Sequence, residues 1–128
     1  MGAITGDGWT KVAVAGNKDY LSKLVDCIHD NAMIAHFSSA SALYAQLNHT
    51  PSMFPPYIII QDSALSLRGI SDERIMLEMI FETGYTGKVF FIGDDGARSR
   101  LASFRHENLF VYDDKQPDLA DRMREQIN

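Results

Sequence analysis

A carboxylate that follows an apolar run is the side chain of this chain best placed to do chemistry. The run Tyr57–Gln61 contains three consecutive isoleucines, and Asp62 comes directly after it. Such an unbroken run is typical of a strand in a parallel sheet that helices cover on both faces. In open parallel sheets, reactive groups gather beyond the carboxyl ends of the central strands. Asp62 therefore occupies the position at which such a fold keeps a reactive acid.

The residues that would share this edge are those that follow the other predicted strands. These strands are Lys11–Ala15, Met33–Phe37, Lys88–Ile92 and Leu109–Tyr112. Gly16 and Asn17 follow Lys11–Ala15, Gly93 follows Lys88–Ile92, and Asp113 follows Leu109–Tyr112. Three further acids lie close to these positions in the sequence: Asp94, Asp95 and Asp114. The sequence thus predicts an edge that is rich in acids and poor in cations.

Helical patterns fill the intervals between the strands. Asn17 is suited to cap a first helix, and Ser39 or Ser41 begins a second. A third begins around Ser71–Glu73, with Ile75, Met76, Met79 and Ile80 as its apolar positions, and ends at Gly84. A fourth is expected from about Ala97 to His106, and a last one after Pro117. Five strands alternating with five helices predict an α/β fold: a doubly wound, five-stranded parallel sheet of flavodoxin-like order 2-1-3-4-5, with helices on both faces.

Composition limits the class of protein. The 128 residues are 45% hydrophobic and 23% charged, which fits one globular domain at residues 11–128 after a Gly-rich flexible leader at residues 1–10. The net charge of −5 argues against a direct nucleic-acid partner. No apolar stretch suggests a membrane span or signal peptide, and the single Cys27, expected to be buried or half-buried, fits a reducing compartment. We therefore expect a cytoplasmic protein that contacts neither nucleic acid nor membrane.

The segment from Lys11 to Ile127 resembles the receiver domain of two-component response regulators. The order and lengths of the elements carry the resemblance, together with the stretch Ile58–Asp62, which matches the third strand and phospho-acceptor aspartate of that family. Gly69 falls close to a glycine that the family has before its third helix. The resemblance implies a signalling domain that sits beside, or attached to, an output module.

The remaining functional positions of the family are changed in this chain. Receivers hold Mg²⁺ with two acids after the first strand, where this chain has Gly16 and Asn17. They bind the phosphoryl oxygens with a Thr or Ser after the fourth strand, here Gly93, and with a Lys after the fifth, here Asp113 or Asp114. Phosphoryl transfer depends on positioning and charge stabilisation. The resemblance therefore implies a pseudo-receiver that is not an enzyme and uses no metal or cofactor.

Other interpretations of the same residues remain open. The first alternative is an active receiver that a histidine kinase phosphorylates on Asp62. The second is a small α/β enzyme or flavin-type binding domain, although Gly16–Asp19 has only one glycine with which to hold a phosphate. Asp62 could also bind a metal together with neighbouring acids, or could simply accept backbone hydrogen bonds.

The family commonly docks partners or dimerises through its fourth helix, fifth strand and fifth helix. In this chain the predicted interaction face comprises two aromatics of the last strand and five arginines: Arg98, Arg100, Arg105, Phe110, Tyr112, Arg122 and Arg124. Aromatic residues and arginines dominate the energetics of protein interfaces. We expect a protein partner, an attached output domain or a second copy to bind there. In the alternative, the aromatics are core and the arginines are solvated.

Overall fold

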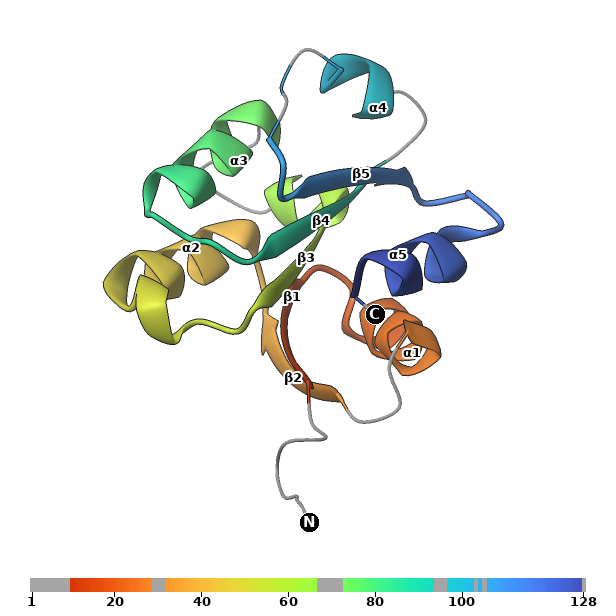
Figure 1. Ribbon diagram of the computed structural model, residues 1–128, viewed down its shortest axis with the longest axis horizontal. Coiled ribbons are helices and arrows are strands. Elements are labelled where there is room, and N and C mark those ends of the chain that lie inside the picture. Colours follow the sequence, from red (N-terminus) through yellow and green to blue (C-terminus); the bar gives the residue numbers. More distant parts are fainter. Residues whose placement is uncertain are drawn as a thin grey trace.

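A computed structural model describes residues 10–28, 32–66, 73–93, 97–102, 104 and 106–127. The strands within these residues are β1 (Thr10–Ala15), β2 (Ala32–Phe37), β3 (Tyr57–Gln61), β4 (Lys88–Gly93) and β5 (Leu109–Asp113). They form one sheet in the order β2-β1-β3-β4-β5, and every neighbouring pair is parallel (Figure 1). The predicted fold class and strand order are confirmed. β1 begins at Thr10, and residues 1–9 of the predicted leader lie outside the described residues.

The helices cover both faces of the sheet. They are α1 (Lys18–Ile28), α2 (Ala40–His49), α3 (Glu73–Glu82), α4 (Ala97–Arg100) and α5 (Leu119–Ile127), with short 3₁₀ turns η2 (Pro51–Met53) and η3 (Asp62–Ser66). Figure 1 shows α1 and α5 on one face of the sheet and α2 and α3 on the other. Successive residues of β3 serve the two layers, since Ile58 and Ile60 pack with α2 and α3 while Ile59 packs with α1 and α5.

Local capping signals behave as the sequence predicts. The Asn17 side-chain oxygen accepts a hydrogen bond from the Tyr20 amide at 2.8 Å, at the start of α1. Ser39, not Ser41, caps α2, because the Ser39 hydroxyl accepts from the Ala42 amide at 3.1 Å. Gly84 follows the end of α3 with a φ of +90°, a conformation that favours glycine.

The fourth helix is much shorter than predicted. We expected it to run from about Ala97 to His106, but α4 ends at Arg100. After the Leu101 amide bonds the Ala97 carbonyl, the Phe104 amide bonds the carbonyl only three residues back, at Leu101. Leu101 is buried and Phe104 packs against the same core, so the predicted inward residues are in place although the α-helical hydrogen bonding ends before them.

One smaller expectation holds only in part, and another fails. Along α3, Met76 and Ile80 are buried and Met79 is half-buried, as expected, whereas Ile75 is 49% exposed and Leu77 is buried instead. α3 begins at Glu73, and this start determines which residues of the helix face the core. Residues 71–72 lie outside the described part of the chain. Cys27 is exposed instead of buried, because α1 turns Leu24, Val25 and Ile28 toward the sheet.

Candidate functional site

The carboxyl ends of β1 and β3 are joined by a glutamine that the sequence analysis did not single out. The Asn17 amide donates a hydrogen bond to the Gln61 side-chain oxygen at 2.8 Å. The Gly16 carbonyl is 3.0 Å from the His36 Nε2 atom on the neighbouring strand β2. Gly16 and Asn17 thus lie beside the end of β3, as predicted, but the Gly16 carbonyl and the Asn17 amide are already hydrogen-bonded to neighbouring side chains.

Gly16 has no room for an acidic side chain. Its φ is +142°, and a Cβ atom placed there would lie 2.6 Å from the Gln61 Cβ atom. Both the backbone conformation and the contact favour glycine. The first of the two positions where receivers carry Mg²⁺-binding acids is therefore closed by packing, in addition to lacking charge.

Gly93 is closed in a similar way. It is buried at the end of β4, and a Cβ atom there would overlap the Ala97 Cβ atom and lie 3.0 Å from the Phe91 ring. Ala97 is the first residue of α4 and is itself fully buried. A threonine or serine hydroxyl at this position would require α4 to move away from the sheet.

Asp62 lies where the sequence predicts, directly after β3. It is half-buried and is the first residue of η3, whose Ala64 and Leu65 are buried in the core. The prediction that Asp62 sits at the carboxyl edge of the sheet is therefore confirmed.

The end of β5 contributes two half-buried carboxylates, Asp113 and Asp114. Asp113 pairs with Gly93 in the sheet, and the Asp114 amide donates to the Gly93 carbonyl at 2.8 Å. One buried oxygen of each carboxylate, Asp113 Oδ1 and Asp114 Oδ1, has no hydrogen-bond partner among the described residues. Burial, followed by the charge of Asp114, raises the pKa of the Tyr20 hydroxyl above its usual value. A phosphoryl group near this edge would add about two negative charges beside these carboxylates.

The residues expected to complete a metal site are only partly placed. Asp94 and Asp95 lie outside the described residues, as does Gly69. Within the described part of the chain, no group of three or more histidines, cysteines or acids is arranged to hold a metal ion. In the same residues, no helix is long and apolar enough to cross a membrane.

The two aromatics of the predicted interaction face pack mainly against the core. The Phe110 ring is half-buried and stacks on Phe90 with centroids 5.4 Å apart. The Tyr112 side chain is 8% exposed, and burial raises its pKa to about 12. The Lys88 ammonium lies 6.0 Å from the centre of the Phe110 ring. Tyr112 therefore presents little surface to solvent, and Phe110 is only partly exposed.

The structure does bring α4, β5 and α5 together around one small pocket. Arg98, Tyr112 and Arg122 line it together with Val111 and Gln116, and its volume is about 140 Å³. Arg122 is held by Asp118, at 2.9 Å, and this hydrogen bond raises its pKa.

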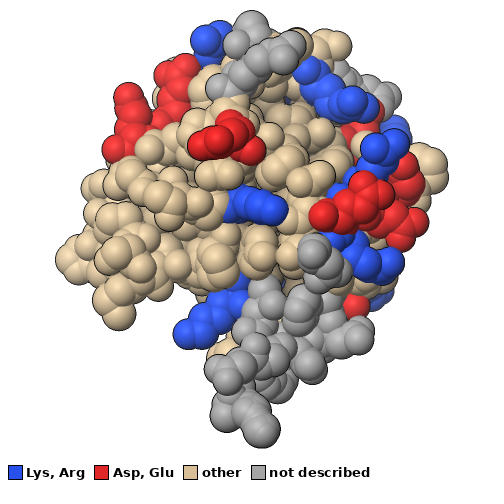
Figure 2. Space-filling model, in the orientation of Figure 1, with Lys and Arg blue, Asp and Glu red and all other residues tan. Residues whose placement is uncertain are grey.

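The other arginines of the predicted face have separate structural roles. Arg100 binds both carboxylate oxygens of Glu73, one of them at 3.2 Å, and so ties α4 to the start of α3. Arg124 pairs with Asp121 at 3.3 Å and donates to the Cys27 carbonyl at the end of α1. Arg105 lies outside the described residues. Figure 2 shows basic and acidic side chains interspersed on the side of the molecule where Figure 1 places α1 and α5.

The comparisons with known proteins agree with this architecture. No protein-family model and no curated protein matches the chain. Among solved structures, it is similar to the crystal structure of the response regulator receiver protein from Sinorhizobium medicae WSM419. The TM-score is 0.66 at 10% sequence identity, over 89% of this chain and 87% of that one. At this identity the similarity establishes the fold alone, and the chain has a receiver-like fold.

Proposed function

We propose that this chain is a receiver-like signalling domain that regulates a partner or an attached output module without being phosphorylated. The observation that carries the proposal is the packing at Gly93, where the Ala97 Cβ atom fills the space that a phosphoryl-binding hydroxyl would need. Gly16 adds a second closed position against Gln61. Asp62 alone retains the chemistry of a phospho-acceptor, and an acceptor without a bound cation or anchoring groups gives little transition-state stabilisation.

The proposed output surface is the face formed by α4, β5 and α5. Arg98 and Arg122 line one small pocket there together with Tyr112, and arginines beside an aromatic are a combination common at protein interfaces. A protein partner, an attached output domain or a second copy of the chain would bind this face. In this proposal the domain acts in the cytoplasm, binds neither nucleic acid nor membrane, and catalyses no reaction.

An active receiver is the second candidate, because Asp62 keeps its place at the end of β3. Treatment with acetyl phosphate and Mg²⁺, followed by intact-mass analysis, separates the two. We expect no phosphoryl adduct on the wild-type chain, and no saturable amide shifts around Asp62 when beryllofluoride is added with Mg²⁺. An adduct that the Asp62→Asn variant cannot form would establish the active receiver instead.

The output face needs its own test, since the absence of an adduct says nothing about docking. The double variant Arg98→Glu/Arg122→Glu reverses both charges beside Tyr112, and Lys23→Glu, on the exposed side of α1, is the matched control. Arg100 is unsuitable because its substitution would also release Glu73. We expect the double variant to lose self-association or the partners retained by the wild type, and Asp62→Asn and Lys23→Glu to keep them. Loss of binding in Asp62→Asn alone would refute the proposal.

A further inference from the structure

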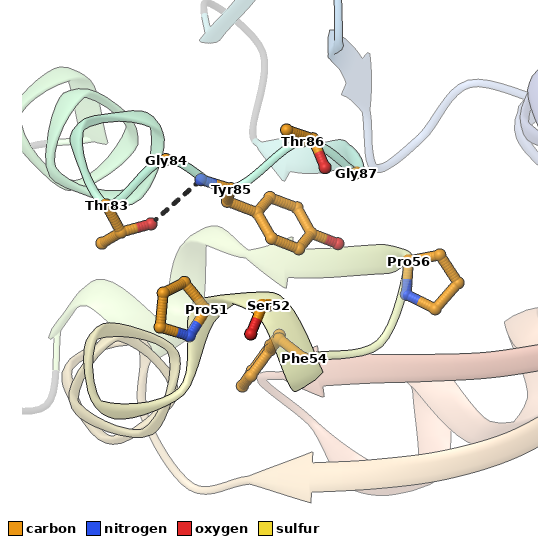
Figure 3. Close-up of a pocket in the computed structure, with 9 residues that line it drawn as sticks. All are labelled: Pro51, Ser52, Phe54, Pro56, Thr83, Gly84, Tyr85, Thr86 and Gly87. Carbon is orange, nitrogen blue, oxygen red and sulfur yellow. Dashed lines mark hydrogen bonds between the residues drawn. The ribbon is translucent and has the colours of Figure 1, made fainter.

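A second pocket lies at the opposite end of the sheet from Asp62. It has a volume of about 460 Å³ and opens between the segment that leads into β3 and the turn that leads into β4 (Figure 3). Pro51, Phe54 and Pro56 come from the first segment, and Tyr85 and Thr86 from the second. The receiver-like site and the output face use none of these residues.

The walls of this pocket are fixed by hydrogen bonds and packing. The Tyr85 hydroxyl donates to the Pro55 carbonyl at 2.6 Å, and the Lys88 amide donates to the Pro56 carbonyl at 3.0 Å. The Tyr85 ring is 6% exposed and meets the Phe54 ring edge to face, with centroids 6.2 Å apart. The two chain segments are therefore held together before any ligand arrives, which lowers the entropic cost of binding.

The lining is uncharged. The residues around the pocket are prolines, aromatics, hydroxyl residues and glycines, and none of them carries a formal charge. Figure 2 shows a stretch without lysine, arginine or acid where Figure 1 places α2 and the segment before β3. A charged ligand would lose water there without gaining a counter-charge. The pocket chemistry therefore selects neutral molecules.

The lining also offers flat apolar surfaces and a few hydrogen-bonding groups. Pro51, Pro56 and the Phe54 ring come from the segment before β3, and the Tyr85 ring comes from the turn before β4. The hydroxyls of Ser52 and Thr86 make no hydrogen bond to any described residue, so both are available to a ligand. Apolar walls with a few placed polar groups are the usual composition of a small-molecule site.

We propose that this pocket binds a small, uncharged, planar ring compound that carries a single polar group such as a carboxamide. The ring lies against Phe54 and the prolines, and the polar group meets the hydroxyls of Ser52 and Thr86. A bound ring links the segment before β3 to the turn before β4. This proposal does not depend on the proposed output function, because the two surfaces share no residue.

Three probes test the chemistry on the wild-type chain, each followed by backbone amide shifts. Benzamide is planar and neutral, benzoate has nearly the same shape but a negative charge, and cyclohexanecarboxamide keeps the polar group on a puckered ring. We expect saturable shifts at residues 84–87 with benzamide, at least tenfold weaker binding of benzoate, and severalfold weaker binding of cyclohexanecarboxamide.

Two adjacent substitutions place the binding in this pocket. Ser52→Trp fills the opening, whereas Met53→Trp adds the same ring next to it, on a side chain that is 82% exposed and does not line the pocket. We expect Ser52→Trp to abolish the benzamide shifts and Met53→Trp to retain them. Thr86→Val, which removes only a hydroxyl, should weaken binding severalfold.

Several results would overturn the proposal. They are the absence of saturable shifts with all three probes, shifts centred on Asp62 or β5, equal affinity for benzamide and benzoate, and unchanged binding in Ser52→Trp. Because the probes are compared on the wild-type chain, the first three outcomes hold even where a variant fails to fold.

Discussion

Two glycines at the carboxyl edge of the sheet lie against neighbours that leave no space for a side chain. Gly16 faces Gln61, and Gly93 faces Ala97. The adjacent Asp113 and Asp114 add buried carboxylate oxygens without partners among the described residues. A larger side chain at either glycine would therefore change the packing as well as the charge of this edge, because it must first displace a neighbour.

The contact between Gly93 and Ala97 gives a direct stability prediction. Gly93→Ser should destabilise the fold by about 1–3 kcal/mol, as overpacking does in well-packed cores. Adding Ala97→Gly removes the opposing Cβ atom and should recover part of that loss, even though glycine weakens the short helix. Urea unfolding of the single and double variants measures the difference. If Gly93→Ser alone is as stable as the wild type, the site is open and the packing argument is wrong.

The burial of Tyr112 predicts a dependence of stability on alkaline pH. Its pKa is raised from 10.0 to about 12, chiefly by burial, so the fold favours the neutral phenol. The resulting stabilisation is complete below the unfolded pKa near 10 and is lost as the pH rises through about 12. Burial raises the pKa of Tyr85 as well, so the Tyr112→Phe variant should lose less stability than the wild type over this range, but not none. Superimposable urea midpoints of the two proteins across the range would contradict this.

At the scale of the elements, hydrogen bonds at the ends of the helices fix the positions of the neighbouring strand ends. Asn17 caps α1 directly after the closed Gly16, so the β1–α1 turn is fixed from both sides. At the far end of the molecule, the last carbonyls of α5 accept hydrogen bonds from Tyr57 and Lys88, which lie on β3 and β4. α5 is therefore anchored to the sheet at its carboxyl end, where helix carbonyls lack partners of their own.

Substitutions of Asn17 test its contribution to the start of α1 against a control substitution in α2. Asn17→Ala removes the oxygen that accepts from the Tyr20 amide and should cost ~1 kcal/mol of unfolding free energy. Asn17→Asp keeps the cap and adds a charge that favours the helix dipole, so it should be close to neutral. Asn48→Ala, at an exposed site within α2, is the control and should cost nothing. Thermal or urea unfolding ranks the three, and equal costs for Asn17→Ala and Asn48→Ala would argue against the cap.

At the scale of the whole molecule, one sheet carries two apolar cores. The core on the α2–α3 side contains Ile58, Ile60 and Phe91, and the core on the α1–α5 side contains Ile59 and Phe90. Alternating residues of the same strands supply both cores, so neither layer is able to lose its packing without disturbing the shared sheet. The domain should therefore unfold as one unit.

Adjacent isoleucines test this cooperativity. Ile59→Ala and Ile60→Ala each remove a fully buried side chain, one from each core, and should each cost roughly 2–5 kcal/mol. Both should leave a single urea transition with an unchanged slope. Met53→Ala, at a side chain that is 82% exposed, should shift stability by no more than about 0.5 kcal/mol. Two resolved transitions in either core variant would show that the layers unfold separately.

The sequence by itself determined the strands, the caps and the position of Asp62. These features follow from local patterns: the unbroken apolar runs of β3 and β4 need cover on both faces, and Asn17 and Gly84 are residue types suited to helix ends. The alternation of five strands with five helices predicted the order of the strands, and the observed sheet has that order. The placement of the receiver-like positions came from the resemblance to a known family.

Only the tertiary structure decided how the edge is closed, how long α4 is and where the uncharged pocket lies. Each depends on contacts between segments far apart in the chain, such as the hydrogen bond from the Asn17 amide to Gln61, 44 residues away, or that from Tyr85 to Pro55, 30 residues away. Gly93 and Ala97 are near in sequence, but their contact depends on where α4 begins and on how it packs against the sheet. Periodicity shows which face of an element is buried, whereas the distance between two side chains depends on how whole elements pack.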